Sequence, residues 1–429
     1  MPASPSTARA INDRLALRLL QQDGPLTATQ LKTSTGLSRP TVADLVERLQ
    51  EAGLIEVVGE AGAERRGPNA RLYGIVANRA HLAALDVRTG SVSVIVADLL
   101  GRTLAEASVP IGSDTGTGPA VERAVALLER TAREAGDAPL HSVGIGAPGL
   151  IDPATGELRI TVGLPAWHRE LVTSLQRRLP AGVLVENETN LAAVAEHRVG
   201  AARDRSTFAL FWLGHAIGAA LMLDGTLRRG ASGGAGEIGF MPVPGAVGTL
   251  SAATCEGGFH SLVGSEAICA LAASHGMEPP RSRADSESEN GADRKGEGEG
   301  DDGGVGGGTE PRCATAGAEQ GHAAAAYVRD ALAGAAGGEP FLGALAHRIA
   351  LGAASVVSVL DPGCLVLAGE VGHAGGAGLA ALVEERLALM SPLRTEVRAG
   401  ELGGTAILRG ALFTAREAAQ DALFAPAAP

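Results

Sequence analysis

The chain has 429 residues, of which 45% are hydrophobic and only 3% aromatic, and its formal net charge is −12. This length and apolar content accommodate two or three domains with cores of their own. No apolar run approaches the roughly 18 residues of a membrane span, and the N-terminus has no signal-peptide core, so we expect a cytoplasmic protein without membrane contact.

The charge is unevenly distributed along the chain. Residues 1–80 contain ten Lys/Arg against eight Asp/Glu, which gives +2 and leaves −14 for the remainder. This asymmetry would let the N-terminal part meet an anionic partner. The four cysteines are scattered and form no CxxC pair, so the sequence indicates neither a disulfide framework nor a cysteine-based zinc site.

Three helices are predicted at the N-terminus. The first spans residues 8–22, where apolar residues recur at helical spacing, namely Ile11, Leu15, Leu19 and Leu20. Thr27 and Gln30 have the capping-box spacing and open a short helix that Gly36 ends. Ser38 caps a third helix, stopped by Gly53, whose buried stripe is Val42, Leu45, Val46 and Leu49.

Two strands follow, at residues 54–58 and 70–76, so the helix-turn-helix pattern takes a winged form. Side chains at the start or on the exposed side of the third helix would reach base edges and phosphates in a major groove: Ser38, Arg39, Thr41, Asp44 and Arg48. Wing arginines would meet phosphates or a minor groove: Arg65, Arg66 and Arg71. The alternative is a three-helix packing module with solvated arginines. The capping order, the turn glycine and the arginine-tipped wing together favour binding to DNA.

From His81 the pattern changes to three strands joined by short turns, followed by alternating helices and strands up to residue 200. This is the pattern of one ribonuclease H-like half-unit. It repeats from Phe208, with a second strand set, a long helix at 341–360 and a strand at 364–368. The sequence therefore predicts an α/β fold in which two similar halves face each other across a cleft.

Glycines concentrate in the stretch from 211 to 243. It is predicted as two strands, an Asp224-Gly225 hairpin and a glycine-rich loop at 230–239 that carries one acid, Glu237. Small residues let a ligand approach the backbone, so this stretch is a candidate for the floor and one wall of a polar small-molecule cleft. The alternative is a tight meander whose glycines serve only turns.

Several motifs resemble one known family. They are GIGAPGLIDPATG (144–156), LPAW (164–167), VENETN (185–190), the glycine-rich stretch, and LDPGCLVLAGEVG (360–372). With the N-terminal helices, the whole chain resembles the ROK family, which comprises transcriptional repressors, uncharacterised reading frames and sugar kinases. It is similar specifically to the repressor branch.

The resemblance implies a winged helix-turn-helix domain at residues 1–78 and a two-lobed, ribonuclease H-like, sugar-kinase-like body. The first lobe would span 79–200, completed by a C-terminal helix at 404–425, and the second lobe 201–403. An insertion at 277–321 is rich in Gly, Ser, Glu and Asp with almost no large apolar residues, so we predict that it is disordered. A functional acidic tether is the alternative.

The resemblance also implies a sugar or sugar derivative in the cleft, held by Asn187, Glu188, Glu237 and His260. Carboxylates and amides supply the paired hydrogen bonds that vicinal hydroxyls require. Other roles stay open: helix capping for Asn187, an ion pair with Arg228 or Arg229 for Glu237, and a satisfied structural role for His260.

Two departures from the family concern catalysis. The kinases' first strand turn reads DxGxT, whereas this chain has Arg88 in place of the glycine that lets the backbone approach phosphate, which argues against ATP binding. The family's catalytic Asp is replaced by Glu188. One extra methylene moves the carboxylate by about 1 Å, which can cost about a hundredfold in rate. We therefore assign Glu188 to ligand contact and no residue to catalysis.

A third departure concerns metal. Family members with zinc use a His at the end of GEIGH and a nearby cysteine cluster, the tetrahedral donor set that zinc prefers. Here Phe240 replaces the histidine and only Cys255 remains downstream. We therefore expect no metal, and hydrophobic packing around Phe240 would hold the loop.

These features together predict a sugar-responsive transcriptional regulator that is not an enzyme and has no cofactor, a repressor of carbohydrate uptake or metabolism genes. Its partners would be operator DNA and a sugar effector. A homodimer or homotetramer is expected because helix-turn-helix readers bind two half-sites. Two alternatives remain: a sugar kinase with an accessory DNA-binding head, and a DNA-binding protein with an empty, degenerate cleft.

Overall fold

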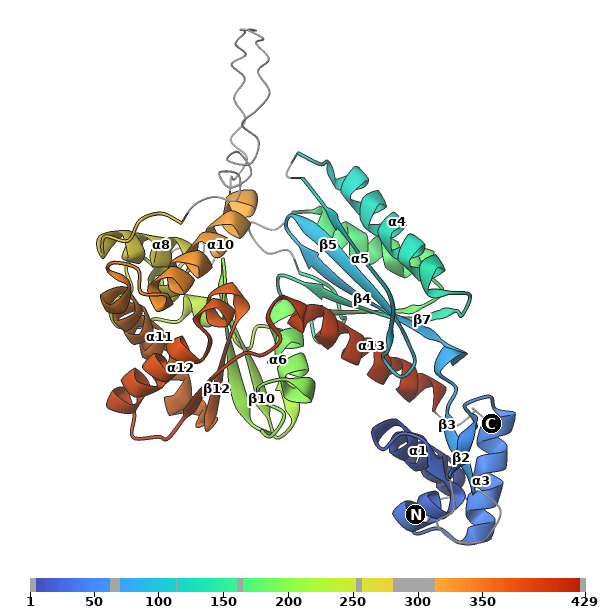
Figure 1. The fold of residues 1–429 in the computed structure, drawn as a ribbon. Coiled ribbons are helices and arrows are strands. Elements are labelled where there is room, and N and C mark those ends of the chain that lie inside the picture. The colour runs from blue at the N-terminus through green and yellow to red at the C-terminus, as the bar shows by residue number, and fades with distance from the viewer. Residues whose placement is uncertain are drawn as a thin grey trace, which may run out of the picture.

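The computed structural model describes residues 5–61, 70–112, 114–159, 165–251, 257–280 and 313–424 (Figure 1). The chain forms a small N-terminal head and a larger body of two lobes. Several features predicted from the sequence lie outside the described residues: Arg65, Arg66, Leu164, Cys255 and the central part of the insertion, 281–312.

The head contains three helices and a three-stranded sheet. The helices are α1 (Pro5–Gln22), α2 (Ala28–Thr35) and α3 (Arg39–Glu51). The sheet has the order β1-β3-β2, from β1 (Leu26–Thr27), β3 (Ala70–Ile75) and β2 (Ile55–Ala61). Thr27 and Gln30 form the predicted capping box, and Gly36 ends α2 in the left-handed conformation with φ 70°. The predicted stripe of α3 is buried throughout.

The inner face of α1 differs from the apolar spacing in the sequence. Ile11 and Leu15 are 58% and 39% exposed, whereas Ala16, Leu17 and Leu20 are buried in the core of the head. The small Ala16 side chain allows close approach of the neighbouring elements. Ile11 and Leu15 therefore lie off the inner face of α1, which packs against α2, α3 and β3.

The first lobe is built on a five-stranded sheet of order β6-β5-β4-β7-β8. Its strands are β4 (His81–Arg88), β5 (Ser91–Asp98), β6 (Thr103–Pro110), β7 (Leu140–Ala147) and β8 (Gly182–Asn187). The first three are antiparallel, and β7 and β8 continue parallel to β4. Leu85 and Val87 face the core under α4 (Thr117–Ala135) and α5 (Trp167–Arg178), while Leu82 and Ala84 face the opposite core. This alternation follows from the strand period of two.

The second lobe repeats the pattern. Its sheet has the order β11-β10-β9-β12-β13. The strands are β9 (Phe208–Leu213), β10 (Ile217–Leu223), β11 (Thr226–Arg228), β12 (Cys364–Ala368) and β13 (Glu396–Ala399). Its helices are α7 (His260–Val263), α8 (Ser265–Ser274), α10 (Cys313–Leu332), α11 (Gly338–Leu360) and α12 (Gly369–Met390). The α/β fold with two ribonuclease H-like halves and a winged head is confirmed.

One helix differs from the expectation that no apolar stretch reaches membrane-spanning length. Among the described residues, α11, with 23 residues, is long and apolar enough to cross a membrane when judged by length and composition alone. Half of this stretch is buried, however, and a Cβ at Gly352 would lie 2.3 Å from the Phe259 ring. The apolar character of α11 is therefore accounted for by its place in the core of the second lobe.

The predicted insertion is shorter than expected at its C-terminal end. Helix α10 begins at Cys313, so residues 313–321 are helical. Four alanines at 323–326 continue the helix, and alanine has the highest helix propensity. Helix α10 packs against α8 and α12, which adds tertiary support that composition does not reveal.

Two helices lie between the sheets, α6 (Glu188–Val199) and α13 (Ala406–Leu423). Helix α13 packs on α6, β4 and β7, then runs towards the head (Figure 1). There Asp421 forms an ion pair with Arg14 of α1, and the buried Phe424 joins the core shared with the head. One helix thus touches both the junction of the lobes and the head.

Candidate functional site

The exposed end of α3 carries three of the residues predicted to face DNA. Ser38 is the N-cap, and its Oγ accepts a hydrogen bond from the Thr41 amide at 3.4 Å. The Ser38 and Thr41 hydroxyls are 2.8 Å apart. Arg39 and Thr41 are exposed in the first turn of the helix. The helix N-terminus, with its positive dipole end, and the Arg39 guanidinium form a face that suits a phosphate.

The other two predicted residues of α3 are engaged within the head. Arg48 Nη2 lies 2.6 Å from Asp13 Oδ1 of α1, and the same guanidinium also pairs with Asp44. The hydrogen bond to Asp13 is the main cause that raises the pKa of Arg48. Arg48 therefore ties α1 to α3, a contact that the sequence did not indicate. Arg71 is exposed on β3.

The cap at Ser38 leads to a testable prediction. Ser38→Ala is expected to weaken α3 by about 1 kcal/mol, because it removes the acceptor for the Thr41 amide. Ser38→Asp, which keeps a good capping oxygen, should leave the stability of α3 unchanged. Amide hydrogen exchange of α3 in the full chain measures both. Equal protection in the Ala and Asp variants would show that the cap contributes nothing.

At the junction of the two lobes, four charged side chains meet; we name Asp86, Arg88, Glu188 and Glu370 the junction cluster. Arg88 Nε donates to Asp86 Oδ2 at 2.9 Å, both at the end of β4. Arg88 Nη1 donates to Glu370 Oε1 at 3.1 Å, in the first turn of α12 and 282 positions away. The cluster joins the carboxyl end of a central strand to two helix N-termini, the usual place for ligands in α/β sheets.

Burial controls the electrostatics of the junction cluster. Burial raises the pKa of Asp86, partly opposed by Arg88, and Asp86 Oδ1 has no hydrogen-bond partner among the described residues. Burial, with repulsion from Asp86 and Glu370 against attraction to Arg88, raises the pKa of Glu188 to about 7. Burial alone would lower the pKa of Arg88, but the charges of Asp86 and Glu370 outweigh it and hold that pKa above its ordinary value.

Two histidines flank the junction cluster. His168 is 1% exposed, and burial lowers its pKa to about 4, partly opposed by the Arg88 backbone beside it. Within the described structure neither of its ring nitrogens completes a hydrogen bond. Burial also lowers the pKa of His215, opposed by the charges of Glu370 and Glu266. The sequence analysis missed Glu370 and both histidines, although Glu370 stands at the strand-to-helix turn of the 360–372 motif.

Asn187 caps α6, as its alternative interpretation proposed. Its Oδ1 accepts from the amides of Thr189 and Asn190 at 2.9 and 3.3 Å. Its Nδ2 donates to the Gly149 carbonyl at 3.0 Å. Both ends of the amide are therefore engaged by the protein, and Asn187 fixes the start of α6 where Glu188 enters the junction cluster.

The glycine-rich loop packs closely on its neighbours. A Cβ at Gly233 would lie 1.9 Å from the Ile151 carbonyl oxygen, and one at Gly236 would lie 1.9 Å from that of Ala219. Both glycines have positive φ, so neither position tolerates a side chain. The structure thus gives these glycines a packing role, in which the loop meets the 149–152 turn and β10.

Glu237 and His260 lie on the second lobe. Arg229 pairs with Glu186 at 2.5 Å, and no described residue pairs with Glu237, whose pKa partial burial raises. Burial lowers the pKa of His260, as does the neighbouring His215. His215 lies near both Glu370 and His260, so His260 is linked to the junction cluster through His215, whereas no hydrogen bond or ion pair among the described residues links Glu237 to it.

The expectation about Phe240 was wrong. Its side chain is 40% exposed, so packing of this ring does not hold the loop. Ile238 is buried instead, and backbone hydrogen bonds fix the loop, from Ala219 N to Gly236 O at 2.7 Å and from Phe259 N to Met241 O at 2.9 Å. Within the described ranges, no three His, Cys, Asp or Glu side chains group as metal ligands.

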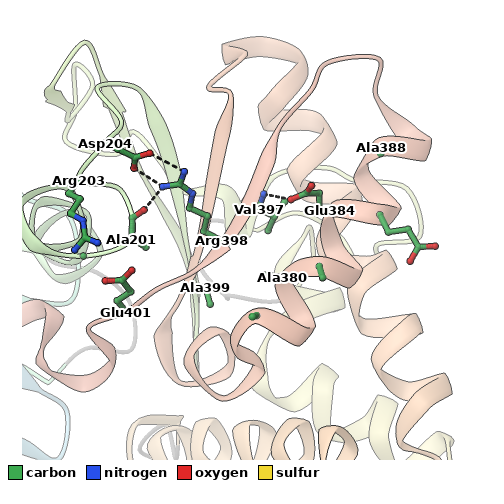
Figure 2. Close-up of a pocket in the computed structure, with 14 residues that line it drawn as sticks. Ala201, Arg203, Asp204, Ala380, Glu384, Ala388, Val397, Arg398, Ala399 and Glu401 are labelled. Atoms are coloured by element: carbon green, nitrogen blue, oxygen red, sulfur yellow. Dashed lines mark hydrogen bonds and ion pairs between the residues drawn. The ribbon is translucent and has the colours of Figure 1, made fainter.

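A groove of about 930 Å³ lies between the turn after α6, helix α12 and strand β13. Figure 2 shows the residues that line it. Alanines form much of its lining, and three of its charged side chains, Asp204, Glu384 and Arg398, are bound within the protein. Arg398 binds Asp204 at 2.6 Å, and Glu384 accepts from the Val397 amide at 2.8 Å. None of the residues predicted to bind sugar lines this groove.

The head and the two matching sheets define a two-lobed, ribonuclease H-like protein with a winged helix-turn-helix head. The chain belongs to the ROK family: the family's model matches residues 82–418. A model described as winged helix-turn-helix DNA-binding matches residues 9–56.

The chain is similar to named transcriptional regulators over little more than half of its length. The DNA-binding transcriptional dual regulator NagC of Escherichia coli is 26% identical over 243 residues, which cover 55% of this chain and 58% of NagC. The xylose repressor of Caldicellulosiruptor bescii is 25% identical over 235 residues, covering 54% of this chain and 58% of that protein. The matched regions thus span little more than half of these relatives.

Two solved structures show the same fold. A ROK family transcriptional regulator, described as a homologue of the E. coli MLC protein, superposes with a TM-score of 0.71 at 18% identity, covering 97% of this chain and 98% of that one. A ROK family glucokinase from Streptomyces griseus, in complex with glucose and AMPPNP, gives 0.58 at 24% identity over 79% of this chain and 99% of that one. The first match extends over head and body alike.

Proposed function

We propose that this protein is a sugar-responsive DNA-binding transcriptional regulator, a repressor of carbohydrate uptake or metabolism genes. The observation that carries the proposal is the union of a winged helix-turn-helix head with a ROK body, with α13 of the body paired to α1 of the head through Asp421 and Arg14. The relatives named as N-acetylglucosamine and xylose repressors support a sugar as the effector.

The body is proposed to bind its effector without phosphorylating it. Arg88 stands where the kinases of the family carry a glycine, and its guanidinium is paired with Asp86 and Glu370. A nucleotide phosphate would have to displace these pairs and approach three carboxylates. Glu188, in the position of the catalytic Asp, has a pKa raised to about 7, so it is partly protonated near neutral pH. Because a raised pKa makes a carboxylate a stronger base, Glu188 itself does not exclude proton abstraction; the ion pairs of Arg88 are what oppose nucleotide binding.

The proposed route from effector to DNA follows α13. An effector between the lobes shifts the equilibrium between open and closed arrangements of the body. Helix α13 contacts α6 and the first sheet and pairs with α1 through Asp421 and Arg14, so its displacement would move the head. In a homodimer or homotetramer this would change the spacing of two heads on an operator.

The domain limits proposed for this mechanism are residues 1–78 for the head, 79–200 with 404–425 for the first lobe, and 201–403 for the second. The packing of α13 on β4 and β7 supports the assignment of the C-terminal helix to the first lobe. Each sheet has the same arrangement, in which one strand pairs antiparallel with one neighbour and parallel with the other: β4 with β5 and β7, and β9 with β10 and β12. This repeated arrangement supports two separate halves.

A thermal-shift screen against sugars, amino sugars and sugar phosphates, with and without Mg-ATP, tests the proposal. A shift with one sugar that needs no ATP is the expected result, and that sugar should change the affinity for DNA sites selected from a random pool. ATP turnover with a hexose would support the kinase alternative. The absence of any sugar effect on stability or DNA affinity would favour the empty cleft.

The head provides a separate prediction. Arg39→Ala is expected to weaken binding to the selected DNA by about 10- to 100-fold, since one base or phosphate contact by arginine is worth about 1–3 kcal/mol. Gel-shift titration at fixed salt measures the loss. Arg177→Ala, an exposed arginine on α5, is the matched control and should leave the affinity unchanged. Equal affinities for the Arg39 variant and the control would refute the assigned DNA face.

A further inference from the structure

The junction cluster has more hydrogen-bond acceptors than donors. Its one guanidinium donates to Asp86 Oδ2 and Glu370 Oε1. Glu188 lies within the field of Asp86, Arg88 and Glu370, but no hydrogen bond from the described residues contributes to its pKa. Asp86 Oδ1 is also unpartnered there. Among the described residues, carboxylate oxygens of Asp86 and Glu188 therefore have no hydrogen-bond donor.

A buried oxygen of the cluster points to a missing partner. The Asp86 side chain is only 5% exposed, and His168, whose ring lies against the Arg88 backbone, is 1% exposed. Asp86 Oδ1 has no partner among the described residues, while the His168 ring has the Arg88 backbone as a polar neighbour. Because most buried polar atoms are hydrogen-bonded, the unpartnered oxygen of Asp86 indicates a polar group that the protein itself does not supply.

The charge of the cluster decides which group fits. Three carboxylates surround one guanidinium, and that guanidinium is already shared by two of them. A phosphate brought to this point would meet further negative charge in a region of low dielectric, where repulsion is strong. Hydroxyl or ammonium groups, in contrast, supply the donors that Asp86 Oδ1 and Glu188 lack.

We propose that the junction cluster selects an unphosphorylated sugar, whose hydroxyl or amino groups donate to Asp86 and Glu188, and rejects the phosphate ester of the same sugar. The inference rests on the proposed function, because it requires a sugar between the lobes. Glu370 comes from the second lobe and the other three residues from the first, so both lobes contribute to the discrimination. The protein would then report the free sugar and not its phosphorylated product.

Calorimetric titration of the full chain tests the selection. The probes are glucose, N-acetylglucosamine and glucosamine, each beside its 6-phosphate, with xylose as a further unphosphorylated sugar. At least one free sugar is expected to bind, with its 6-phosphate at least tenfold weaker. Glucosamine distinguishes an ammonium donor from a hydroxyl donor. Inorganic phosphate alone should produce no thermal shift.

Variants separate the cluster from a general charge effect. Glu370→Gln removes one negative charge and is expected to reduce the discrimination against the 6-phosphate several-fold. Glu385→Gln lies on the same helix but lines the groove of Figure 2, so it should leave the discrimination unchanged. Glu188→Gln provides an independent second variant if Glu370→Gln fails to fold.

Three outcomes would overturn the inference. If a 6-phosphate binds as tightly as its parent sugar or more tightly, the selection is wrong while sugar-responsive regulation stands. If the Glu370 and Glu385 variants change the discrimination equally, the cluster does not set it. If no probe of either kind binds, the proposed function fails together with the inference.

Discussion

Gly410→Ala is expected to destabilise the protein by about 3 kcal/mol, the upper part of the usual range for overpacking a core. A Cβ at Gly410 would lie 2.0 Å from the Leu191 carbonyl oxygen, where α13 crosses α6. The obstacle is backbone, so the two helices must separate. A glycine-to-alanine change inside a helix otherwise stabilises by about 0.5–1 kcal/mol, so the sign of the effect identifies the contact.

Gly118→Ala is the matched control, because Gly118 lies in α4 and a Cβ added there would meet no atom within 4 Å. It should be neutral or slightly stabilising. Denaturant unfolding of both variants measures the difference. Since α13 also contacts the head, the Gly410 variant should in addition lose part of the sugar effect on DNA affinity. Equal stability of the two variants would contradict the close crossing of α13 and α6.

Glu188→Gln is expected to make the protein more stable than the wild type at pH 8, by up to about 3 kcal/mol. The pKa of Glu188 is raised from 4.5 to about 7 by burial and by Asp86, so the folded state binds this proton more tightly than the unfolded state. The stability of the wild type therefore falls as the pH rises from about 4.5 to 7 and then levels off. Glutamine carries no such charge.

The difference between wild type and Glu188→Gln should close towards pH 5. The groups that face Glu188 are Asp86, Arg88 and Glu370. Asp86 has a pKa raised by burial and acts in the same direction, while Arg88 stays charged. Thermal unfolding across this pH range is the measurement. Glu385→Gln is the control, and its difference in stability from the wild type should not change with pH. A difference that is constant with pH would contradict the assignment.

Interactions within a few residues were determined by the sequence alone. The capping box from Thr27 to Gln30, the left-handed turn at Gly36 and the cap at Ser38 each depend on neighbours three or four positions away. The duplicated strand pattern was also legible, because alternation and turn residues repeat along the chain. These local signals are sufficient to predict the helices and strands of the head and the two similar halves of the body.

Contacts between distant residues were decided only by the tertiary structure. The pairing of Arg48 with Asp13 joins residues 35 positions apart, and that of Arg88 with Glu370 joins residues 282 apart. No periodicity records such partners, so the sequence assigned Arg48 to DNA and overlooked Glu370. Likewise, which side of α1 faces inward, Ala16 rather than Ile11, depends on the helices packed against it. Interactions between near neighbours determine the helices and strands and where they end. The balance of charge in the junction cluster depends on packing of the two lobes, because Glu370 comes from the second lobe and Arg88 from the first.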